Sequence, residues 1–426
     1  MARRNPTGVV VLAIIALAAV VTAIGLVTAG AIKVPGLSSP ATTTAPPGPL
    51  ELVLPQANRA VSRAERALGV RLPSREGAPA PALPTLAGTG VGGHEVVGFV
   101  PAYELGRLST IAFADFSELV YSSVGLLPTG GLDEKSFGAA EIGYGHVAPL
   151  VSAAHRAGVP VLLSLALSDQ SAIDSLVAAP AADAARTAAE AASLLKSVGF
   201  DGVDLDVEGR NAGDRAGFAA YVTALAADLR AKNPTWSLLV NVYPNSVVNP
   251  GDFFDVTALA RVASQLFVMA YDMNDQQVPS ATAPLTGADL SDATALATYA
   301  QVGLASKCVL GIPFYGYDFP ASRAGVPADT VGTPYSVTYD EIVAAGRQVR
   351  WDPVTETPYS VFRRDGQWHQ TWFDDPVSVA LKTALAWEFH TAGVGVWELG
   401  MAAGQPQMNE ALVAGGSVTR LPLASR

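Results

Sequence analysis

Three acidic side chains share one face of a short predicted strand. The stretch Phe200–Gly209 has the sequence FDGVDLDVEG, whose alternation predicts a β-strand. Asp204, Asp206 and Glu208 fall on one face of it, while the apolar residues between them fall on the other. Placing carboxyl groups side by side costs desolvation and adds like-charge repulsion. Folds that keep such an arrangement typically use it to push pKa values apart, so that one acid stays protonated while its neighbours ionise.

Two simpler interpretations fit this stretch less well. Residues 204–209 match the first, third, fifth and sixth positions of an EF-hand calcium loop. The twelfth position of that loop requires a Glu, and Arg215 stands there instead. Leu205 and Val207 also continue a buried strand where a calcium loop would be solvated. We therefore prefer a catalytic strand to either a calcium loop or a solvated acidic turn.

The composition excludes several classes of function. Lys and Arg number 27 against 38 Asp and Glu, and the formal charge of −11 argues against a nucleic-acid partner. The single cysteine, Cys308, excludes an internal disulfide and a cysteine-rich metal site. The five histidines lack ligand spacing, and the sequence contains no G-x-S-x-G, H-E-x-x-H or Walker motif. We expect neither a metal nor a cofactor.

The N-terminus carries a targeting segment, which we assign to residues 1–33. Arg3 and Arg4 precede an uncharged run of 25 residues, from Gly8 to Ile32, which is long enough to span a bilayer. An A-x-A-like site at residues 29–31 leaves a cleaved signal peptide as the alternative. We favour a membrane anchor. In both cases the remainder of the chain is expected outside the cytoplasm.

Residues 34–93 have the composition of a linker. Ten of the thirty prolines lie between residues 34 and 86. Residues 57–68 interrupt this pattern with helical spacing, which fits a short helix at the membrane surface or a transient helix in a linker. Residues 88–93 satisfy G-x-G-x-x-G, but they precede a strand, whereas a dinucleotide fingerprint follows one. We interpret them as a flexible joint.

Residues 94–426 predict a (β/α)8 barrel of the α/β class. Eight short apolar runs alternate with amphipathic stretches, as expected for parallel strands that are buried on both faces. The active site of such a barrel lies at the C-terminal ends of the strands. The eight runs are 95–100, 118–124, 159–167, 202–208, 237–242, 265–271, 308–313 and 393–399. The helices expected between them are 147–157, 181–198, 215–232, 293–306 and 377–390.

The acidic strand resembles the D-x-x-D-x-D-x-E signature of glycoside hydrolase family 18, the chitinases and endo-β-N-acetylglucosaminidases. The matching residues are Asp201, Asp204, Asp206 and Glu208. Other strand ends are similar to the family, and the resemblance extends over about residues 94 to 415. These ends are Met269-Ala270-Tyr271-Asp272, Ile312 to Gly316, and Trp397 after the eighth run. The aromatic-rich residues 317–375 resemble the small α+β insertion that many members carry between strand 7 and helix 7.

The resemblance implies a retaining glycosidase in which the substrate's own 2-acetamido group is the nucleophile. Glu208 would be the general acid and later the base, and Asp206 would orient the acetamido group. Asp204 would share a proton with Asp206, and Tyr271 would donate its hydroxyl to the acetamido oxygen. Asp201 would support the turn into the strand. The residues implied to contact the substrate are Met269, Asp272, Trp397, Tyr243 and Tyr315.

Three departures from the family pattern leave the substrate open. The third strand has Ser164 to Leu167 in place of S-x-G-G, Phe99 stands where a Tyr is common, and Gly209-Arg210 follows the acid in place of Tyr-Pro. Chitin, peptidoglycan and N-glycans all remain candidates, with endo or exo cleavage. A catalytically silent carbohydrate-binding protein and an enzyme for sugars without an acetamido group are the alternatives. We expect a monomer that binds N-acetylglucosamine-containing polysaccharide and is attached to the membrane by its N-terminal helix.

Overall fold

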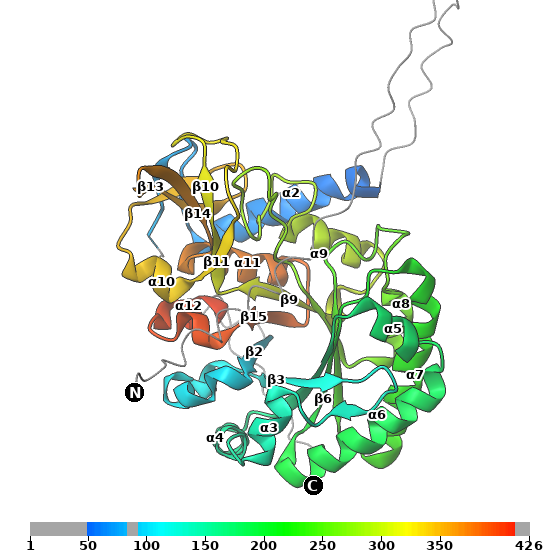
Figure 1. Ribbon diagram of the computed structural model, residues 1–426. Coiled ribbons are helices and arrows are strands. Elements are labelled where there is room, and N and C mark those ends of the chain that lie inside the picture. Colours follow the sequence, from blue (N-terminus) through cyan, green and yellow to red (C-terminus); the bar gives the residue numbers. More distant parts are fainter. Residues whose placement is uncertain (1–48, 83–92, 414–426) are drawn as a thin grey trace, which may run out of the picture. The chain divides into compact units, whose positions relative to one another are not determined.

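Eight parallel strands form a closed barrel in the computed structural model, which describes residues 49–82 and 93–413 (Figure 1). Neighbouring strands pair in chain order, and the last strand pairs with the first and closes the ring. This confirms the predicted fold class and all eight predicted strands. The barrel strands are β2 (Glu95–Pro101), β3 (Glu118–Leu126), β5 (Val161–Leu167), β6 (Gly202–Val207), β7 (Ser237–Val242), β8 (Gln265–Val268), β9 (Cys308–Pro313) and β15 (Gly393–Trp397).

Helices follow most barrel strands, and a 3-10 stretch, η1 (Ala102–Thr110), follows β2. The five predicted helices are all present, to within a few residues at their ends. A short antiparallel strand, β4 (Leu132–Asp133), pairs with β3. The helices around the barrel are α3 (Phe137–Gly143), α4 (Ala148–Arg156), α5 (Gln170–Leu176), α6 (Pro180–Leu194), α7 (Arg215–Lys232), α8 (Val256–Val262), α9 (Asp292–Gln301), α11 (Pro376–Glu388) and α12 (Pro406–Leu412).

The acidic strand β6 lies between β5 and β7. Val203, Leu205 and Val207 are buried in the layer between strands and helices, at 1% exposure or less. Asp204 is fully buried on the other face, inside the barrel. The period-two pattern of the sequence therefore separates an outward apolar face from an inward acidic one, because successive side chains of a strand alternate between its faces.

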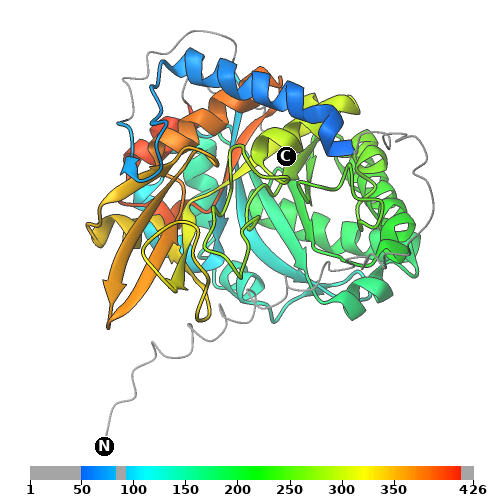
Figure 2. The same cartoon turned by 90° about the horizontal axis from the view of Figure 1, so that it is seen from above.

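An antiparallel sheet interrupts the chain between β9 and α11, where the family resemblance implied a small α+β insertion. Its strand order is β1-β12-β13-β14-β10-β11, and α10 (Tyr339–Ala344) follows β11. Figure 2 shows this sheet beside one edge of the barrel. The strands are β10 (Tyr315–Ala321), β11 (Tyr335–Thr338), β12 (Val349–Asp352), β13 (Thr357–Arg364) and β14 (Gln367–Trp372), joined by β1 (Ala78–Pro79).

The prediction of a linker is corrected for residues 49–82. Residues Pro49–Leu68 form a 20-residue helix, α2, which lies across α9 and α11 in both views (Figures 1 and 2). Ala60 and Ala64 are fully buried there, and Arg63 forms an ion pair with Glu388 of α11. After α2, strand β1 pairs with β12 of the insertion sheet. This segment is therefore part of the barrel domain.

We expect Ala60→Glu to lower the free energy of unfolding by about 2 kcal/mol or more, because it buries an unpaired carboxylate between α2 and the barrel helices. Asn58→Glu is the matched control, since Asn58 is exposed on the same helix. Urea denaturation of residues 47–426 measures both variants. If Ala60→Glu is as stable as the control, α2 does not contribute to the fold in the way its burial indicates.

No helix within residues 49–82 and 93–413 combines the length and apolar character needed to cross a membrane. The predicted anchor at residues 1–33 and the Gly-rich joint at 88–93 lie outside the described residues, apart from Gly93.

Candidate active site

The end of β6 is fixed by contacts to the strands and loops beside it. The backbone N–H of Glu208 donates to the carbonyl of Leu167 at the end of β5, at 2.9 Å. Glu208 itself is partly exposed, whereas Asp204 lies deeper and is fully buried. The three predicted carboxyl groups therefore follow one another from the barrel interior to its C-terminal opening, in the order Asp204, Asp206, Glu208.

Asp206 is held from the neighbouring strand by an amide. The Asn241 side chain on β7 donates through Nδ2 to Asp206 Oδ1 at 3.0 Å, and Asn241 is 3% exposed. Burial raises the pKa of Asp206, and this hydrogen bond opposes the increase. The pKa of Asp204 lies well above its usual range because of burial and the charge of Asp206, while Ser164 and Asn241 oppose the shift in part. One proton shared by the two carboxyl groups is the arrangement that this environment favours.

Glu208 has the properties of a general acid at neutral pH. Burial, together with the charges of Asp206 and Asp272, raises the pKa of Glu208 to about 8, and Arg210 acts in the opposite direction. A carboxyl group with this pKa is protonated at pH 7 and still able to release its proton to a substrate.

Two tyrosines and an aspartate lie beside the carboxyl groups. Burial and the charges of Asp206 and Glu208 raise the pKa of Tyr271 well above its usual range, so that its hydroxyl keeps its proton. Asp272 follows it with a φ of 54°, a left-handed conformation that Asp tolerates better than most residues. The Tyr315 hydroxyl donates to Asp272 Oδ1 at 2.8 Å. The loop after β8 and the start of the insertion are thereby joined at this side of the site.

The interior of the barrel forms an apolar floor beneath these groups. Met269, Tyr271, Tyr243 and Trp397 belong to or pack on the cluster of buried side chains inside the barrel. Phe99 of β2 lies against the partly exposed Trp397, with ring centroids 5.5 Å apart. The ring of Tyr243 is close enough to Glu208 for that charge to raise the tyrosine pKa, although burial is the larger cause.

Asp201 lies away from the other carboxyl groups, before the first residue of β6. Its Oδ2 accepts from the backbone N–H of Val161 at 2.8 Å and contacts His155 Nε2 at 2.7 Å. Asp201 therefore connects the start of β6 with the start of β5 and the end of α4, which is a supporting position.

Sequence reasoning missed two residues of this site. Asn241 was not singled out, although an amide between Val240 and Val242 in a buried strand is itself a signal of a polar partner. Tyr317 was noted only as the start of the insertion, yet with Tyr315 it opposes the burial-driven rise in the pKa of Asp272. Both tyrosines lie more than forty positions after Asp272 in the chain. Neither hydrophobic periodicity nor a local sequence motif reveals a contact over such a distance.

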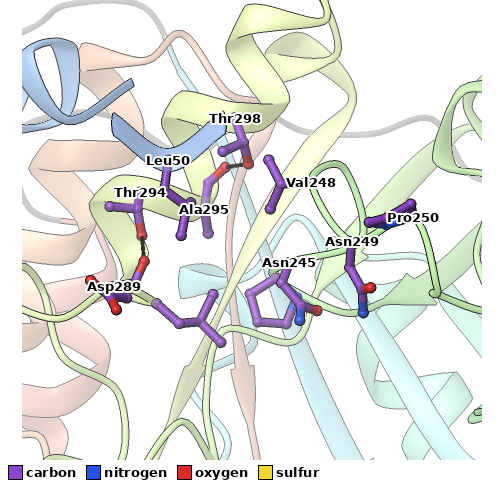
Figure 3. Close-up of a pocket in the computed structure, with 11 residues that line it drawn as sticks. Leu50, Asn245, Val248, Asn249, Pro250, Asp289, Thr294, Ala295 and Thr298 are labelled. Carbon is purple, nitrogen blue, oxygen red and sulfur yellow. Dashed lines mark hydrogen bonds between the residues drawn. The ribbon is translucent and has the colours of Figure 1, made fainter. Parts of the chain in front are cut away.

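A separate pocket of about 320 Å³ lies between α2, the loop after β7 and α9 (Figure 3). The two threonines that line it form hydrogen bonds to nearby backbone carbonyls. Thr298 Oγ1 donates to the carbonyl of Ala295, and Thr294 Oγ1 donates to the carbonyl of Asp289. None of the carboxyl groups of β6 lines it. This pocket is therefore separate from the carboxyl groups of β6.

We expect Asn241→Ala to move the acidic limb of the rate profile to higher pH and to lower kcat about tenfold, as loss of one charge-assisted hydrogen bond predicts. The amide stabilises the ionised form of Asp206, so its removal raises the pKa at which that carboxylate gains a proton. Initial rates between pH 4 and pH 9 measure this. Asn245→Ala, in the loop beyond β7, is the control. An unchanged acidic limb in Asn241→Ala would contradict this role.

Comparisons with known proteins agree with the geometry. A model of the family described as Glycosyl hydrolases family 18 matches residues 95–402. Di-N-acetylchitobiase of Mus musculus is 27% identical over 163 residues, which is 34% of this chain and 44% of the chitobiase. The match thus spans less than half of that relative.

Two solved structures share the fold. One is a GH18 chitinase from Cycas revoluta in complex with (GlcNAc)3, with a TM-score of 0.67, 23% identity, and coverage of 76% of this chain and 100% of the chitinase. The other is a chitinase-like agglutinin from Robinia pseudoacacia, with a TM-score of 0.66, 24% identity, and coverage of 75% and 99%. With a family match over most of its length and the acidic strand at the barrel opening, the chain belongs to glycosyl hydrolases family 18.

Proposed function

We propose that this protein hydrolyses β-linked N-acetylglucosamine in a polysaccharide, by a retaining route in which the substrate's acetamido group takes part. The observation that carries the proposal is strand β6, which brings Asp204, Asp206 and Glu208 from the barrel interior to its C-terminal opening, where burial raises the pKa of Glu208 to about 8. The chitinase of Cycas revoluta, solved with (GlcNAc)3, and the mouse chitobiase support the choice of sugar.

The first step breaks the glycosidic bond. Glu208 gives its proton to the glycosidic oxygen, and the bond between that oxygen and the anomeric carbon breaks. The carbonyl oxygen of the 2-acetamido group bonds to the anomeric carbon from the opposite face and forms an oxazolinium ion. Asp206 accepts a hydrogen bond from the acetamido N–H, which stabilises the positive charge, while the proton held between Asp204 and Asp206 limits the repulsion within the pair.

The second step releases the sugar. Glu208, now a carboxylate, takes a proton from water, and the oxygen of that water bonds to the anomeric carbon as the oxazolinium ring opens. The acetamido group and the enzyme are restored, and the anomeric configuration is retained. Tyr271 donates its hydroxyl to the acetamido oxygen, and Trp397 with Met269 supplies an apolar surface for the sugar ring. Asp272 and Tyr315 line the same side, and Tyr243 lies beside the acid.

A catalytically silent lectin is the second candidate, and the agglutinin of Robinia pseudoacacia gives it some support. The presence of Glu208, with its pKa raised by burial and neighbouring carboxylates, favours an enzyme. A binding protein has no use for a proton donor held at the barrel opening beside two other carboxyl groups. We further propose that the barrel acts outside the cytoplasm as a monomer, attached through the N-terminal segment or secreted.

We expect kcat/KM on chitooligosaccharides to fall as the pH rises through about 8, because deprotonated Glu208 cannot donate a proton. At the acidic side, rates fall when the Asp204 and Asp206 pair takes up its second proton. Initial rates across this range measure both limbs, and proton NMR of the first product identifies its anomer. A first product of the α configuration from a β-linked substrate would contradict the retaining route.

A further inference from the structure

The backbone that carries the general acid is held by both neighbouring βα units. On the β5 side, the N–H of Glu208 donates to the carbonyl of Leu167 at 2.9 Å, and the N–H two residues later donates to Gln170 Oε1 at 2.7 Å. From the β7 side comes the loop between β7 and α8, whose Phe253 ring lies against Gly209. The acid is therefore carried by a segment with hydrogen bonds on one side and an aromatic ring on the other.

The contact between Gly209 and Phe253 leaves no room for a side chain. A Cβ on Gly209 would lie 2.5 Å from the ring carbons Cδ2 and Cε2 of Phe253, a distance that real Cβ atoms essentially never show. The φ of Gly209 lies outside the left-handed region, so the ring, and not the backbone conformation, requires a glycine here. Both residues are buried. Ring and backbone are thus in direct contact one residue after the acid.

The ring of Phe253 is itself fixed by other aromatic rings. Its centroid lies 4.5 Å from that of Phe218 on α7 and 4.9 Å from that of Phe254, with an angle of 73° between the planes of the second pair. All three rings are fully buried. Tilted and edge-to-face pairs of this kind add to the stabilisation that burial alone provides. The ring that touches Gly209 therefore has little freedom to move away from it.

The same loop supports Tyr243, which packs on the apolar cluster inside the barrel. The rings of Tyr243 and Phe254 meet edge to face, with centroids 5.0 Å apart. The backbone carbonyl of Tyr243 accepts a hydrogen bond from the hydroxyl of Tyr299, a fully buried residue of α9, at 2.8 Å. Because Phe253 and Phe254 are consecutive, one short segment supports both Gly209 and Tyr243.

We propose that Phe253 is a positioning residue for the general acid, because its ring, packed against Gly209, holds Glu208 at the barrel opening in the direction of the glycosidic oxygen. Through Phe254, the same loop holds the ring of Tyr243 beside the acid. Both phenylalanines are fully buried, so they act on the reaction only through the residues that they contact. Misplacing a catalytic group by about 1 Å can cost about a hundredfold in rate. This inference rests on the proposed function.

The test uses two substitutions that each break the contact and together restore it. Gly209→Ala adds a methyl group that collides with the ring, and Phe253→Leu removes the ring. The double variant gives the methyl group the space that the ring has left, so its effect should differ from the product of the two single effects. Phe389→Leu, which removes a buried ring at the end of α11, is the control. The charged groups that act on Glu208 stay the same in every variant, and they are Asp206, Asp272 and Arg210.

Gly209→Ala and Phe253→Leu should each lower kcat on chitooligosaccharides about tenfold with little change in KM, because the acid is displaced while the residues proposed to bind the sugar remain. The double variant should recover most of the kcat that Gly209→Ala loses. A displaced acid is less buried, and burial is the largest cause of its raised pKa. The alkaline limb should therefore move to lower pH in both single variants and return in the double one. Phe389→Leu should lower stability and leave kcat and the limb unchanged.

The titration of Glu208 can also be measured without hydrolysis. In protein labelled with carbon-13 glutamate, its carboxyl resonance is the one that Glu208→Gln lacks, and NMR between pH 4 and pH 9 gives its pKa. The same pKa in wild type and both single variants, or a double variant whose kcat is no higher than that of Gly209→Ala, would overturn the role of Phe253. If wild type cleaves neither chitooligosaccharides nor peptidoglycan fragments, the proposed function fails, and the NMR titration still decides the role of Phe253.

Discussion

Glu208→Gln should reduce hydrolysis of chitooligosaccharides by about a hundredfold or more, the range expected when a general acid is lost. The amide has the shape of the carboxyl group but carries no proton that it can transfer. Substrate binding should persist, because Asp206, Tyr271 and Trp397 remain in place. The loss is therefore expected in kcat, with little change in KM.

The control for this variant is Glu134→Gln, which changes an exposed carboxyl group in the loop after β4. Glu134→Gln should unfold at the urea concentration of the wild type, and Glu208→Gln at a higher one, with a difference that grows from about pH 4.5 to about pH 8. That sign follows because the folded-state pKa of Glu208 is raised, so ionisation of the unfolded chain above pH ~4.5 lowers the stability of the wild type. Activity of Glu208→Gln within a factor of about three of wild type would be incompatible with an acid at this position.

Lys382→Ala should lower the free energy of unfolding by about 3–5 kcal/mol, since it leaves two buried carboxyl groups without their cation. Lys382 on α11 is fully buried, and its Nζ lies 2.9 Å from Asp374 Oδ2 and 3.0 Å from Asp292 Oδ2. It also donates to the carbonyl of Ala283 at 2.5 Å. Burial alone would lower the pKa of this lysine, but the two carboxylates outweigh it and the net shift is upward.

Lys196→Ala, an exposed lysine, serves as the control and should change stability by no more than about 0.5 kcal/mol. Lys382→Met adds a second check, because it keeps the volume and removes only the charge. Its destabilisation should be smaller at pH 5 than at pH 8, where Asp292 and Asp374 must ionise without a partner. If Lys382→Ala lowers the free energy of unfolding by less than about 1 kcal/mol, the ion pairs of Lys382 with Asp292 and Asp374 contribute little to stability.

The barrel was predictable because each of its strands is buried on both faces. Runs such as Cys308–Pro313 and Gly393–Trp397 are apolar along their whole length, and they recur at the spacing of βα units. The insertion was expected from the resemblance to the family, whose members carry a small α+β segment at this point, and the aromatic-rich residues 317–375 marked its place. Its strand order, and the pairing of β1 with β12, depend on contacts between distant segments and were not accessible from the sequence.

The packing of helix α2 on the barrel was not predicted, because the proline-rich composition favoured a linker although the spacing of residues 57–68 already indicated a short helix. Six prolines lie at residues 35 to 55 and four more at residues 73 to 84, which suggests a linker on both sides of the helix. The buried positions Val53, Ala57, Ala60 and Ala64 nevertheless recur at three or four residues. Their small side chains permit close packing on α9 and α11. Only the structure shows that α9 and α11 pack against this side of α2.

The acidic strand of the site could be predicted from the sequence. The side chains that hydrogen-bond to the carboxyl groups of the site could not. Alternation alone places Asp204 and Asp206 on one face of β6. The amide of Asn241 reaches Asp206 from another strand, and Tyr315 reaches Asp272 from the insertion. Such contacts depend on strand register and on the path of loops. The raised pKa of Glu208 likewise depends on burial by segments far away in the chain.

Inhibition by a thiazoline analogue of the oxazolinium ion tests the account most directly. The analogue places its ring where the acetamido group closes on the anomeric carbon, so it should compete with chitooligosaccharides for the wild-type protein. Its affinity should decrease in Asp206→Ala, which loses the acceptor for the ring N–H. Tight, competitive inhibition that weakens in this variant is the result expected for substrate-assisted hydrolysis. An active protein that the analogue does not inhibit would contradict the mechanism.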